Sequence, residues 1–209
     1  MIKILIADDH TVVRQGLRQI LQEEYTSAEF GEATSGNDAL EKARNEKWNV
    51  IILDITMPGR NGLEVLKQLR FESIKTPVLI LSMHSEDQYA VRMLKAGASG
   101  YLTKESASEE LVTAINRIIS GRKYITESLA EKLACSLDYD TDKPLHELVS
   151  DREFQVLCLI ASGKTVSEIA FELSLSVPTI STYRTRILEK MNMKSNAELT
   201  HYAIRQGLA

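Results

Sequence analysis

The first 120 residues alternate short apolar runs with amphipathic stretches, and this alternation constrains the fold more than any other feature of the sequence. Three runs are continuous and rich in Ile, Val and Leu, and two are weaker. The five runs are residues 4–7, 29–33, 50–54, 78–82 and 99–102. Continuous apolar runs of this length are typical of strands buried on both faces of a parallel sheet. Five such strands alternating with five helical patterns predict a doubly wound α/β domain.

The stretches between these runs repeat apolar residues at helical spacing. The first predicted helix places five apolar side chains on one face: Val12, Val13, Leu17, Ile20 and Leu21. Right-handed crossovers cover both faces of the sheet with such helices. A ligand site is then expected outside the carboxyl ends of the strands, at a topological switch point.

Length and composition exclude several classes of protein. The chain has 209 residues, enough for one large domain or two small ones, and only 10 Gly, 4 Pro and 2 Cys, which argues against collagen-like chains and disulfide scaffolds. The N-terminal apolar run is too short for a signal peptide, and no run approaches the ~20 residues that cross a bilayer. Cys135 and Cys158 lie far apart without a CxxC pattern. We therefore expect a reduced cytoplasmic protein that has no membrane partner.

Charge is distributed unevenly along the chain. Residues 125–149 carry 2 basic and 6 acidic side chains, whereas residues 150–209 carry 7 and 6. The acidic segment contains a weakly helical stretch and a charged tract, a combination that indicates a linker. The predicted parts are an α/β domain over residues 1–121, an acidic linker over 122–147 and a helical domain over 148–209.

Four helices are predicted after residue 148. They begin at the capping box of Ser150 and Glu153 and continue as residues 165–173, 178–191 and 197–206. The second and third are joined by a tight turn, as in a helix-turn-helix, whose second helix enters the DNA major groove. We expect Val177 to plug this turn, and Ile180 and Ile187 to anchor the second helix of the motif. A helical bundle with a solvated basic face is the alternative.

Acidic side chains follow two of the predicted strands. Asp8 and Asp9 come after the first strand, and Asp54 ends the third. The carboxyl ends of parallel strands meet at one edge of a sheet, so these three carboxylates are expected to converge there. An Asp that caps a helix would explain one of them. A hard cation such as Mg²⁺, which takes carboxylate oxygens, would explain all three.

Two further strand ends supply a hydroxyl and an ammonium group. Ser82 ends the fourth strand, and Lys104 follows the fifth. Either residue alone would be an ordinary loop side chain. A carboxylate that is attacked at phosphorus becomes an acyl phosphate, and the transfer needs its oxygens neutralised by a metal ion and a cation. One metal, one Lys and one hydroxyl around one Asp would meet that need.

These residues carry a resemblance to a known family. Asp8-Asp9, the stretch DITMPGRNG at residues 54–62, Ser82 and the stretch YLTK at residues 101–104 resemble the receiver domain of two-component response regulators. The resemblance covers residues 1 to about 121 and implies a flavodoxin-like (βα)5 fold. It also implies that Asp54 accepts a phosphoryl group from the phosphohistidine of a sensor histidine kinase.

The resemblance further implies a role for each residue of the pocket. Asp9 and Asp54 would hold Mg²⁺, with Asp8 close by and the Thr56 carbonyl as a further ligand. Ser82 would be the switch hydroxyl, Tyr101 the switch aromatic and Lys104 the partner of the phosphoryl group. Glu105 stands where receivers often have a Pro on a cis peptide bond.

The helical region carries a second resemblance. Residues 150–153 (SDRE), 179–183 (TISTY) and 187–191 (ILEKM) are similar to the LuxR-type output domain over about 148–209. A receiver joined to this domain resembles the NarL/FixJ family of response regulators, and among them the EvgA/BvgA/UvrY-like members most. The implied function is that of a DNA-binding transcription regulator, active as a dimer through its last helix.

The family position implies which residues contact DNA. The contacts to bases would come from Ser181, Thr182 and Thr185, and those to phosphates from Lys164, Thr179, Tyr183, Arg184 and Arg186. Lys190 lies on the same outward face. Ser181 stands where many relatives have Lys or Arg, so more of the affinity must come from its neighbours.

Two other functions are alternatives to phosphorylation-controlled binding of promoter DNA. A Mg²⁺ phosphohydrolase with an aspartyl nucleophile needs a general acid two residues after the nucleophile, where this chain has Thr56. A pure interaction module would not need the acidic residues, all of which are present. We therefore expect no enzyme beyond the chain's own phosphoryl transfer and dephosphorylation.

Overall fold

The computed structural model describes residues 1–138 and 144–208, without the side chains of residues 87, 88, 132 and 134–138. The chain divides into two compact units, Met1–Ala130 and Glu131–Ala209. Most of the predicted acidic tract and the side chain of Cys135 lie outside the described residues. Cys158 is buried and forms no disulfide among the described residues.

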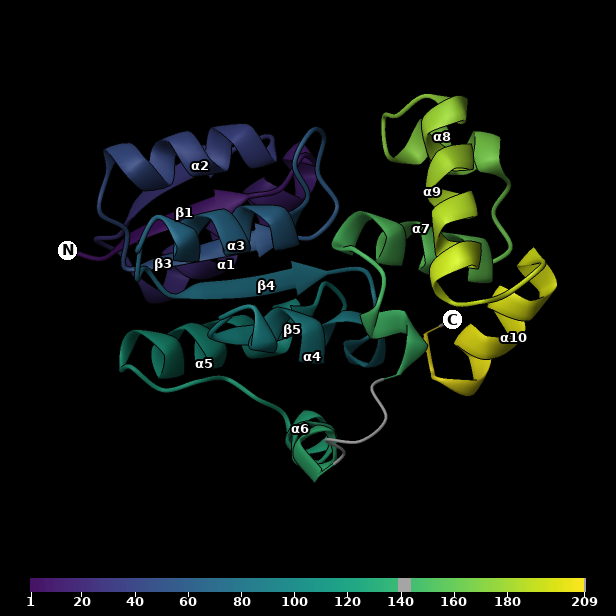
Figure 1. Cartoon of the computed structure of the whole chain (residues 1–209). Helices are drawn as coiled ribbons and strands as arrows, with labels where there is room; N and C mark the ends of the chain where they lie inside the picture. The colour runs from purple at the N-terminus through teal and green to yellow at the C-terminus, as the bar shows by residue number, and fades with distance from the viewer. Residues whose placement is uncertain (139–143, 209) are drawn as a thin grey trace. The chain divides into compact units, whose positions relative to one another are not determined.

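The first unit is built on a parallel sheet of five strands (Figure 1). The strands are β1 (Lys3–Ala7), β2 (Glu29–Ala33), β3 (Val50–Asp54), β4 (Val78–Ser82) and β5 (Gly100–Thr103). Their order is β2-β1-β3-β4-β5, so the chain reverses its direction of winding between β1 and β3. The predicted doubly wound flavodoxin-like fold is confirmed.

Five helices connect and follow the strands. They are α1 (Thr11–Glu24), α2 (Gly36–Asn45), α3 (Gly62–Phe71), α4 (Glu86–Lys95) and α5 (Ala107–Ile119). Helices α1 and α5 pack on each other and share an apolar core with the sheet, while α2 packs against α3. In that core Leu17 and Leu21 of α1 meet Ile4 and Ile6 of β1. The helices thus leave the carboxyl ends of the strands available for a site.

The prediction for the first helix is wrong at one residue of its apolar face. Val12 is 81% exposed, whereas Leu17 and Leu21 of the same helix are buried. Val12 lies in the first turn, and its neighbour Val13 takes the inward position. The buried face instead includes Arg14, a charged residue that apolar spacing does not reveal.

The β3–α3 loop is held in place by two local features. Gly62 lies so close to β3 that a Cβ atom there would be 2.3 Å from the Asp54 carbonyl oxygen. Asn61 caps α3 in a capping box with Glu64, in which each side chain bonds the other residue's backbone N–H. These features fix the backbone that carries Asp54.

The segment after α5 packs on the first unit. Tyr124 forms a parallel bridge with Gly100 of β5, and its hydroxyl donates a 2.7 Å hydrogen bond to Glu110. Thr126 donates a 2.7 Å hydrogen bond to Glu86 and precedes helix α6 (Glu127–Asp138). The first compact unit therefore extends past residue 121, where the helical pattern of the sequence ends.

The second unit is helical. A short 3₁₀ helix η1 (Leu145–Glu147) precedes α7 (Asp151–Ala161), α8 (Val166–Glu172), α9 (Val177–Lys190) and α10 (Asn196–Arg205). Helix α7 is buried from Glu153 to Ala161 and packs against the other three. The predicted capping box of Ser150 and Glu153 is confirmed.

The turn between α8 and α9 differs from the prediction at one residue. Ile180 and Ile187 are fully buried as expected, but Val177 is 45% exposed and does not plug the turn. Ser176 is the N-cap and accepts a hydrogen bond from the Thr179 N–H, which makes Val177 the first residue of α9. The helix therefore begins one residue earlier than predicted.

Within the described ranges, every helix is too short or too polar to span a membrane.

Candidate functional site

The pairing of the strands brings the predicted pocket residues to one edge of the sheet. Ala7 is paired with Leu53, so Asp8 follows β1 at the level of Asp54, the last residue of β3. Ser82 is paired with Thr103, and the Lys104 N–H donates a 2.8 Å hydrogen bond to the Ser82 carbonyl. This edge includes the switch point between β1 and β3, where ligands bind in doubly wound sheets.

Lys104 joins two of the carboxylates. Its Nζ lies 2.8 Å from Oδ2 of Asp54 and 2.6 Å from Oδ2 of Asp8. Both aspartates are almost fully buried, and the Lys104 side chain is only 10% exposed. The ammonium group offsets part of the repulsion between two buried carboxylates.

Burial dominates the protonation of the pocket. It raises the pKa of Asp54 to about 6, against the lowering effect of Lys104. Asp8 raises that pKa further, and a hydrogen bond from the Thr56 N–H lowers it. Burial lowers the pKa of Lys104, but the charges of Asp54 and Asp8 outweigh it and leave the pKa raised. At neutral pH Asp54 is thus mainly a carboxylate beside a protonated Lys104.

The two predicted switch residues are fully buried in this structure. The Ser82 hydroxyl accepts a 3.1 Å hydrogen bond from the His84 N–H. The Tyr101 hydroxyl donates to the carbonyls of His84 and Ser85, at 2.8 and 3.4 Å. Burial raises the pKa of Tyr101 above its ordinary range. Both side chains thus contact the segment that leads from β4 to α4.

The residues present fit a divalent cation. Asp8 Oδ2 is buried and paired with Lys104 at 2.6 Å, and Asp9 Oδ1 is buried beside the His10 ring. Carboxylates with free lone pairs in one pocket match the ligand preference of Mg²⁺. The Thr56 N–H bonds Oδ1 of Asp54 at 3.3 Å, which places its backbone beside the pocket.

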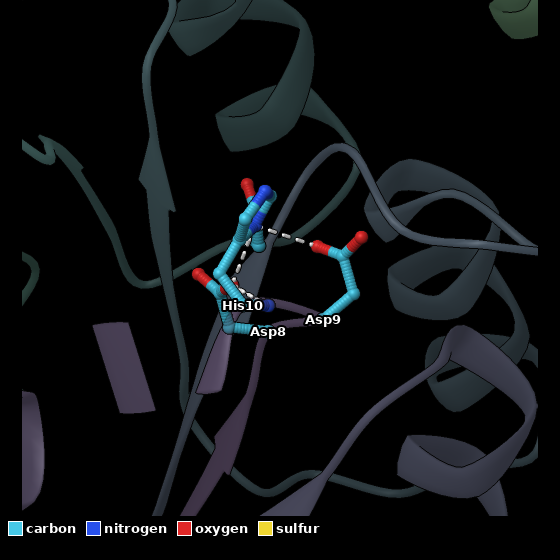
Figure 2. Close-up of side chains that lie close together, drawn as sticks. Asp8, Asp9 and His10 are labelled. Atoms are coloured by element: carbon cyan, nitrogen blue, oxygen red, sulfur yellow. Dashed lines mark hydrogen bonds and ion pairs between the residues drawn. The ribbon is translucent and has the colours of Figure 1, made fainter. Parts of the chain in front are cut away.

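Two residues near the pocket were missed by the sequence analysis. His10 directs Nδ1 toward the carboxylates of Asp8 and Asp9 (Figure 2). Arg14 is buried and donates to the Asp8 carbonyl at 2.8 Å and to Glu32 at 3.0 Å. The position of His10 directly after two aspartates was a usable signal. The role of Arg14 has no comparable signal, because it depends on which way α1 faces.

The predicted DNA-contacting residues lie on or near α9. Ser181, Thr182, Thr185 and Arg186 are exposed. The Thr182 and Thr185 hydroxyls donate to helix carbonyls of Pro178 and Ser181, at 3.0 and 3.1 Å. Their oxygens can still accept hydrogen bonds from outside the helix.

The basic residues of this region differ in their partners. The Arg184 Nε donates a 2.5 Å hydrogen bond to Asn196 at the start of α10. Lys190 pairs at 2.6 Å with Glu153, which is 2% exposed, and Lys164 pairs with Glu172. Tyr183 and Thr179 are half-buried on the same helix. Lys164 lies before α8 rather than on α9, so the structure does not place it on the helix that carries the other predicted contacts.

Comparisons with known proteins match both parts of the chain. Residues 4–116 match the family described as response regulator receiver domain. Residues 147–203 match the bacterial regulatory proteins of the luxR family.

Full-length relatives show the same arrangement. The chain is 38% identical to the response regulator UvrY of Escherichia coli K12, over 100% of this chain and 96% of UvrY. It is 37% identical to the response regulator GacA of Pseudomonas aeruginosa, over 100% and 98%. RcsB of Salmonella enterica, solved bound to a promoter with phosphomimetic BeF₃⁻, aligns at 25% identity and a TM-score of 0.59, over 96% and 97%. Another structure contains two RcsB dimers bound to two parallel DNAs.

The fold, the acidic pocket and the helix-turn-helix define a two-component response regulator with a LuxR-type DNA-binding domain. The chain belongs to the NarL/FixJ family of these regulators, as its similarity to UvrY and GacA shows.

Proposed function

We propose that Asp54 accepts a phosphoryl group from the phosphohistidine of a sensor histidine kinase, in a pocket that binds Mg²⁺. The observation that carries this proposal is the position of the Lys104 ammonium, within 2.8 Å of both Asp54 and Asp8 in one buried pocket. Asp9 and Asp54 would hold the ion, with Asp8 close by and the Thr56 carbonyl as a further ligand. Bound Mg²⁺ supplies neutralisation of phosphoryl oxygens.

The chain's own groups account for the transfer. A carboxylate oxygen of Asp54 attacks phosphorus, the phosphorus–nitrogen bond to the histidine breaks, and an acyl phosphate forms on Asp54. Asp54 has a pKa of about 6, so it is ionised at neutral pH and is a competent nucleophile. Lys104 moves from the carboxylate to a phosphoryl oxygen, and the Ser82 hydroxyl donates to another. The chain acts as phosphoacceptor, so it is an enzyme only toward itself.

Phosphorylation replaces the single charge of the Asp54 carboxylate with a phosphoryl group of about −1.5 to −2 and three acceptor oxygens, a local change that can bias a two-state element. Ser82 and Tyr101 reorient, and with them the segment at His84 and Ser85 that Tyr101 now bonds. The proposed consequence is dimerisation and tighter binding to two DNA half-sites. RcsB dimers on DNA support this arrangement by analogy.

We also propose which residues contact DNA and how the chain is divided into parts. Residues 148–209 bind double-stranded DNA with α9 in the major groove, and residues 122–147 link them to the receiver over 1–121. Bases contact Ser181, Thr182 and Thr185, and phosphates contact Lys164, Thr179, Tyr183, Arg184 and Arg186, with Lys190 beside them. Because its proposed target is DNA, we place this activity in the cytoplasm.

Labelling tests the phosphoacceptor directly. The full chain is incubated with a small acyl-phosphate donor and Mg²⁺, and incorporation is measured by mass spectrometry. We expect one phosphoryl group on the wild-type chain, none on Asp54→Ala, and normal incorporation on Asp38→Ala, which removes an aspartate from the start of α2. Persistent labelling of Asp54→Ala would refute the assignment.

A further inference from the structure

Arg14 of α1 is a buried cation beside the phosphoacceptor pocket, and the transfer as proposed does not use it. Its side chain is 7% exposed. Nη1 donates a 2.8 Å hydrogen bond to the Asp8 carbonyl, Nε donates a 3.0 Å bond to Glu32, and Nη2 donates a 3.2 Å bond to the Thr11 hydroxyl. Because the guanidinium group is planar and rigid, these three bonds fix its orientation.

The backbone of Asp8 lies between two regular elements and is held by contacts from outside them. Strand pairing ends at Ala7 on both sides of β1, and α1 begins at Thr11. The Asp8 N–H donates a 3.1 Å hydrogen bond to the Ala33 carbonyl of β2, and the Asp8 carbonyl accepts the bond from Arg14. Arg14 therefore supplies one of the two bonds that fix this peptide.

The side chain of Asp8 contacts the reacting groups. Its Oδ2 lies 2.6 Å from Nζ of Lys104, and the same Nζ lies 2.8 Å from Oδ2 of Asp54. A continuous series of polar contacts therefore leads from β2 to the phosphoacceptor, and its members are Glu32, Arg14, Asp8, Lys104 and Asp54. All of them except Glu32 are at most 10% exposed. In an interior packed this closely, displacement of one member is transmitted to the next.

We propose that Arg14 is a positioning residue for phosphoryl transfer to Asp54. Arg14 holds the Asp8 peptide where the Asp8 carboxylate keeps the Lys104 ammonium beside the phosphoacceptor, and Glu32 orients Arg14. The inference rests on the proposed function, because the reaction is the one assigned to Asp54. A displacement of about 1 Å within a reactive pocket can slow a reaction about 100-fold. An outer residue can therefore matter for the rate without contacting the phosphoryl group.

A purely structural role for Arg14 is the alternative. A buried cation paired with Glu32 would hold α1 on β2 and contribute to stability, since removal of one partner leaves the other unpaired. The two roles differ in the folded chain. Loss of a structural residue lowers the urea midpoint and leaves the phosphorylation rate of folded molecules unchanged, whereas loss of a positioning residue lowers that rate as well.

The experiment measures two quantities on the full-length chain: the rate of phosphorylation by acetyl phosphate with Mg²⁺, and the urea midpoint from Trp48 fluorescence. Arg14→Met keeps most of the apolar stem and removes the guanidinium group. Arg70→Met is the matched control, because Arg70 is half-buried and also donates to backbone carbonyls, those of Gly97 and Ile74. These carbonyls lie in the loops that enter β5 and β4, at the opposite edge of the sheet.

We expect Arg14→Met to slow phosphorylation of the folded chain about tenfold or more, and Arg70→Met to change the rate less than about twofold. Both variants should lower the urea midpoint. Arg14→Lys should be about threefold slower than the wild-type chain, because lysine keeps the charge but has one nitrogen for three partners. Glu32→Gln should slow the reaction about twofold, and the double variant should be no slower than Arg14→Met, because Glu32 acts through Arg14.

A wild-type rate in folded Arg14→Met, or an equal loss in Arg70→Met, would overturn the inference. Additive losses in the double variant would overturn the orienting role of Glu32. If Arg14→Met does not fold, Arg14→Lys takes its place, and a wild-type rate there would overturn the inference. If Asp54 of the wild-type chain is phosphorylated and the Arg14 variants match its rate, only this inference fails. If Asp54 of the wild-type chain takes up no phosphoryl group, the proposed function itself fails.

Discussion

At the scale of single residues, the pocket depends on a backbone segment that is packed too closely at Gly62 to accept a larger side chain. Gly62 follows the loop that leaves Asp54, and a Cβ atom there would lie 2.3 Å from the Asp54 carbonyl oxygen and 2.9 Å from the Ile55 Cα. Backbone atoms cannot move aside as the end of a flexible side chain can. The residue at this position therefore determines where the phosphoacceptor lies.

Gly62→Ala is expected to destabilise the first unit by about 1–3 kcal/mol, the typical cost of overpacking that forces a backbone shift. The measurement is the urea midpoint followed by fluorescence of Trp48, the single tryptophan of the chain. Gly16→Ala is the matched control, since nothing lies within 4 Å of a Cβ atom there and alanine favours the helix by about 0.5–1 kcal/mol. Equal midpoints for the two variants would contradict the prediction.

A buried carboxylate holds the second unit together. Glu153 is 2% exposed, closes the capping box of α7 and pairs with Lys190 of α9. Burial raises the pKa of Glu153, but the hydrogen bonds from Lys190 and Ser150 outweigh it and leave the pKa below its usual value of 4.5. A lowered carboxyl pKa stabilises the fold above that value, and the contribution is lost as pH falls through the folded pKa.

Glu153→Gln is therefore expected to cost about 1 kcal/mol at pH 7, a figure that allows for screening because Lys190 is exposed. The cost should shrink below pH 4.5, where the wild-type carboxylate takes up its proton. Amide hydrogen exchange of α7 and α9 in the full chain measures both effects. Glu168→Gln changes an equivalent capping box at an exposed site and should have a smaller effect. A pH-independent loss in Glu153→Gln would show that the charge is not responsible.

At the scale of elements, α6 begins on the switch segment of the first unit. Thr126 accepts a hydrogen bond from the Leu129 N–H at 3.3 Å and donates one to Glu86 at 2.7 Å. Glu86 opens α4, directly after Ser85, whose carbonyl the Tyr101 hydroxyl contacts. One threonine thus caps α6 and joins its start to the segment that the proposed switch residues contact.

Thr126→Val keeps the size of the side chain and removes both hydrogen bonds. We expect faster amide exchange at the start of α6, by a factor of about 5, which corresponds to the ~1 kcal/mol of a helix cap. Thr126→Ser, which keeps the hydroxyl, should behave as the wild-type chain. Equal protection in the valine and serine variants would exclude this role of the hydroxyl.

The positions of the strands could be predicted because strands buried on both faces have continuous runs of apolar residues in the sequence. The two weakest runs, 29–33 and 99–102, are the edge strands β2 and β5. β2 pairs with β1 alone and is mostly half-buried, while β5 pairs with β4 and is bridged at Gly100 by Tyr124. Two side chains were assigned to the wrong side. Val12 is exposed because it stands nine residues, or about two and a half turns, before the buried Leu21 on α1, and Val177 is exposed as the first residue of α9.

The sequence predicted which residues make up the site, but not their individual contacts. Strand ends gave the set of residues at the edge, because parallel strands bring their carboxyl ends together. The contacts of Lys104 with both Asp8 and Asp54, and the turn of His10 toward two carboxylates, depend on rotamers that spacing does not encode. The pair of buried Arg14 with half-buried Glu32 could not be found because it joins α1 to β2 across 18 residues of sequence.

At the scale of the whole molecule, charge limits how the chain can bind DNA. The chain is net −4, and residues 150–209 carry 7 basic and 6 acidic side chains. Two of those basic residues, Lys164 and Lys190, already pair with glutamates. So weak a positive charge gives little sequence-independent affinity. Two chains on two half-sites would compensate, because linked binding events raise avidity without new contacts.

Arg184 offers a way to measure whether DNA binding depends on two chains. Its Nε is held by Asn196, which leaves the other guanidinium nitrogens oriented for a phosphate at little entropic cost. In a phosphorylated dimer, Arg184→Ala removes one phosphate contact from each chain. The slope of log affinity against log salt concentration should then become shallower by about 2, at about 0.9 per contact.

Arg44→Ala provides the charge-matched comparison, since Arg44 pairs with Glu72 on the first unit and its loss should leave the slope unchanged. The titration is run from low to high salt with phosphodonor and Mg²⁺ present, on DNA selected for two half-sites. A decrease of about 1 would mean that a single chain contacts DNA, and would contradict dimeric binding. No decrease would remove Arg184 from the phosphate contacts. Asp54→Ala should keep the slope of one chain under all these conditions, because in our proposal the phosphoryl group is what brings the second chain to the DNA.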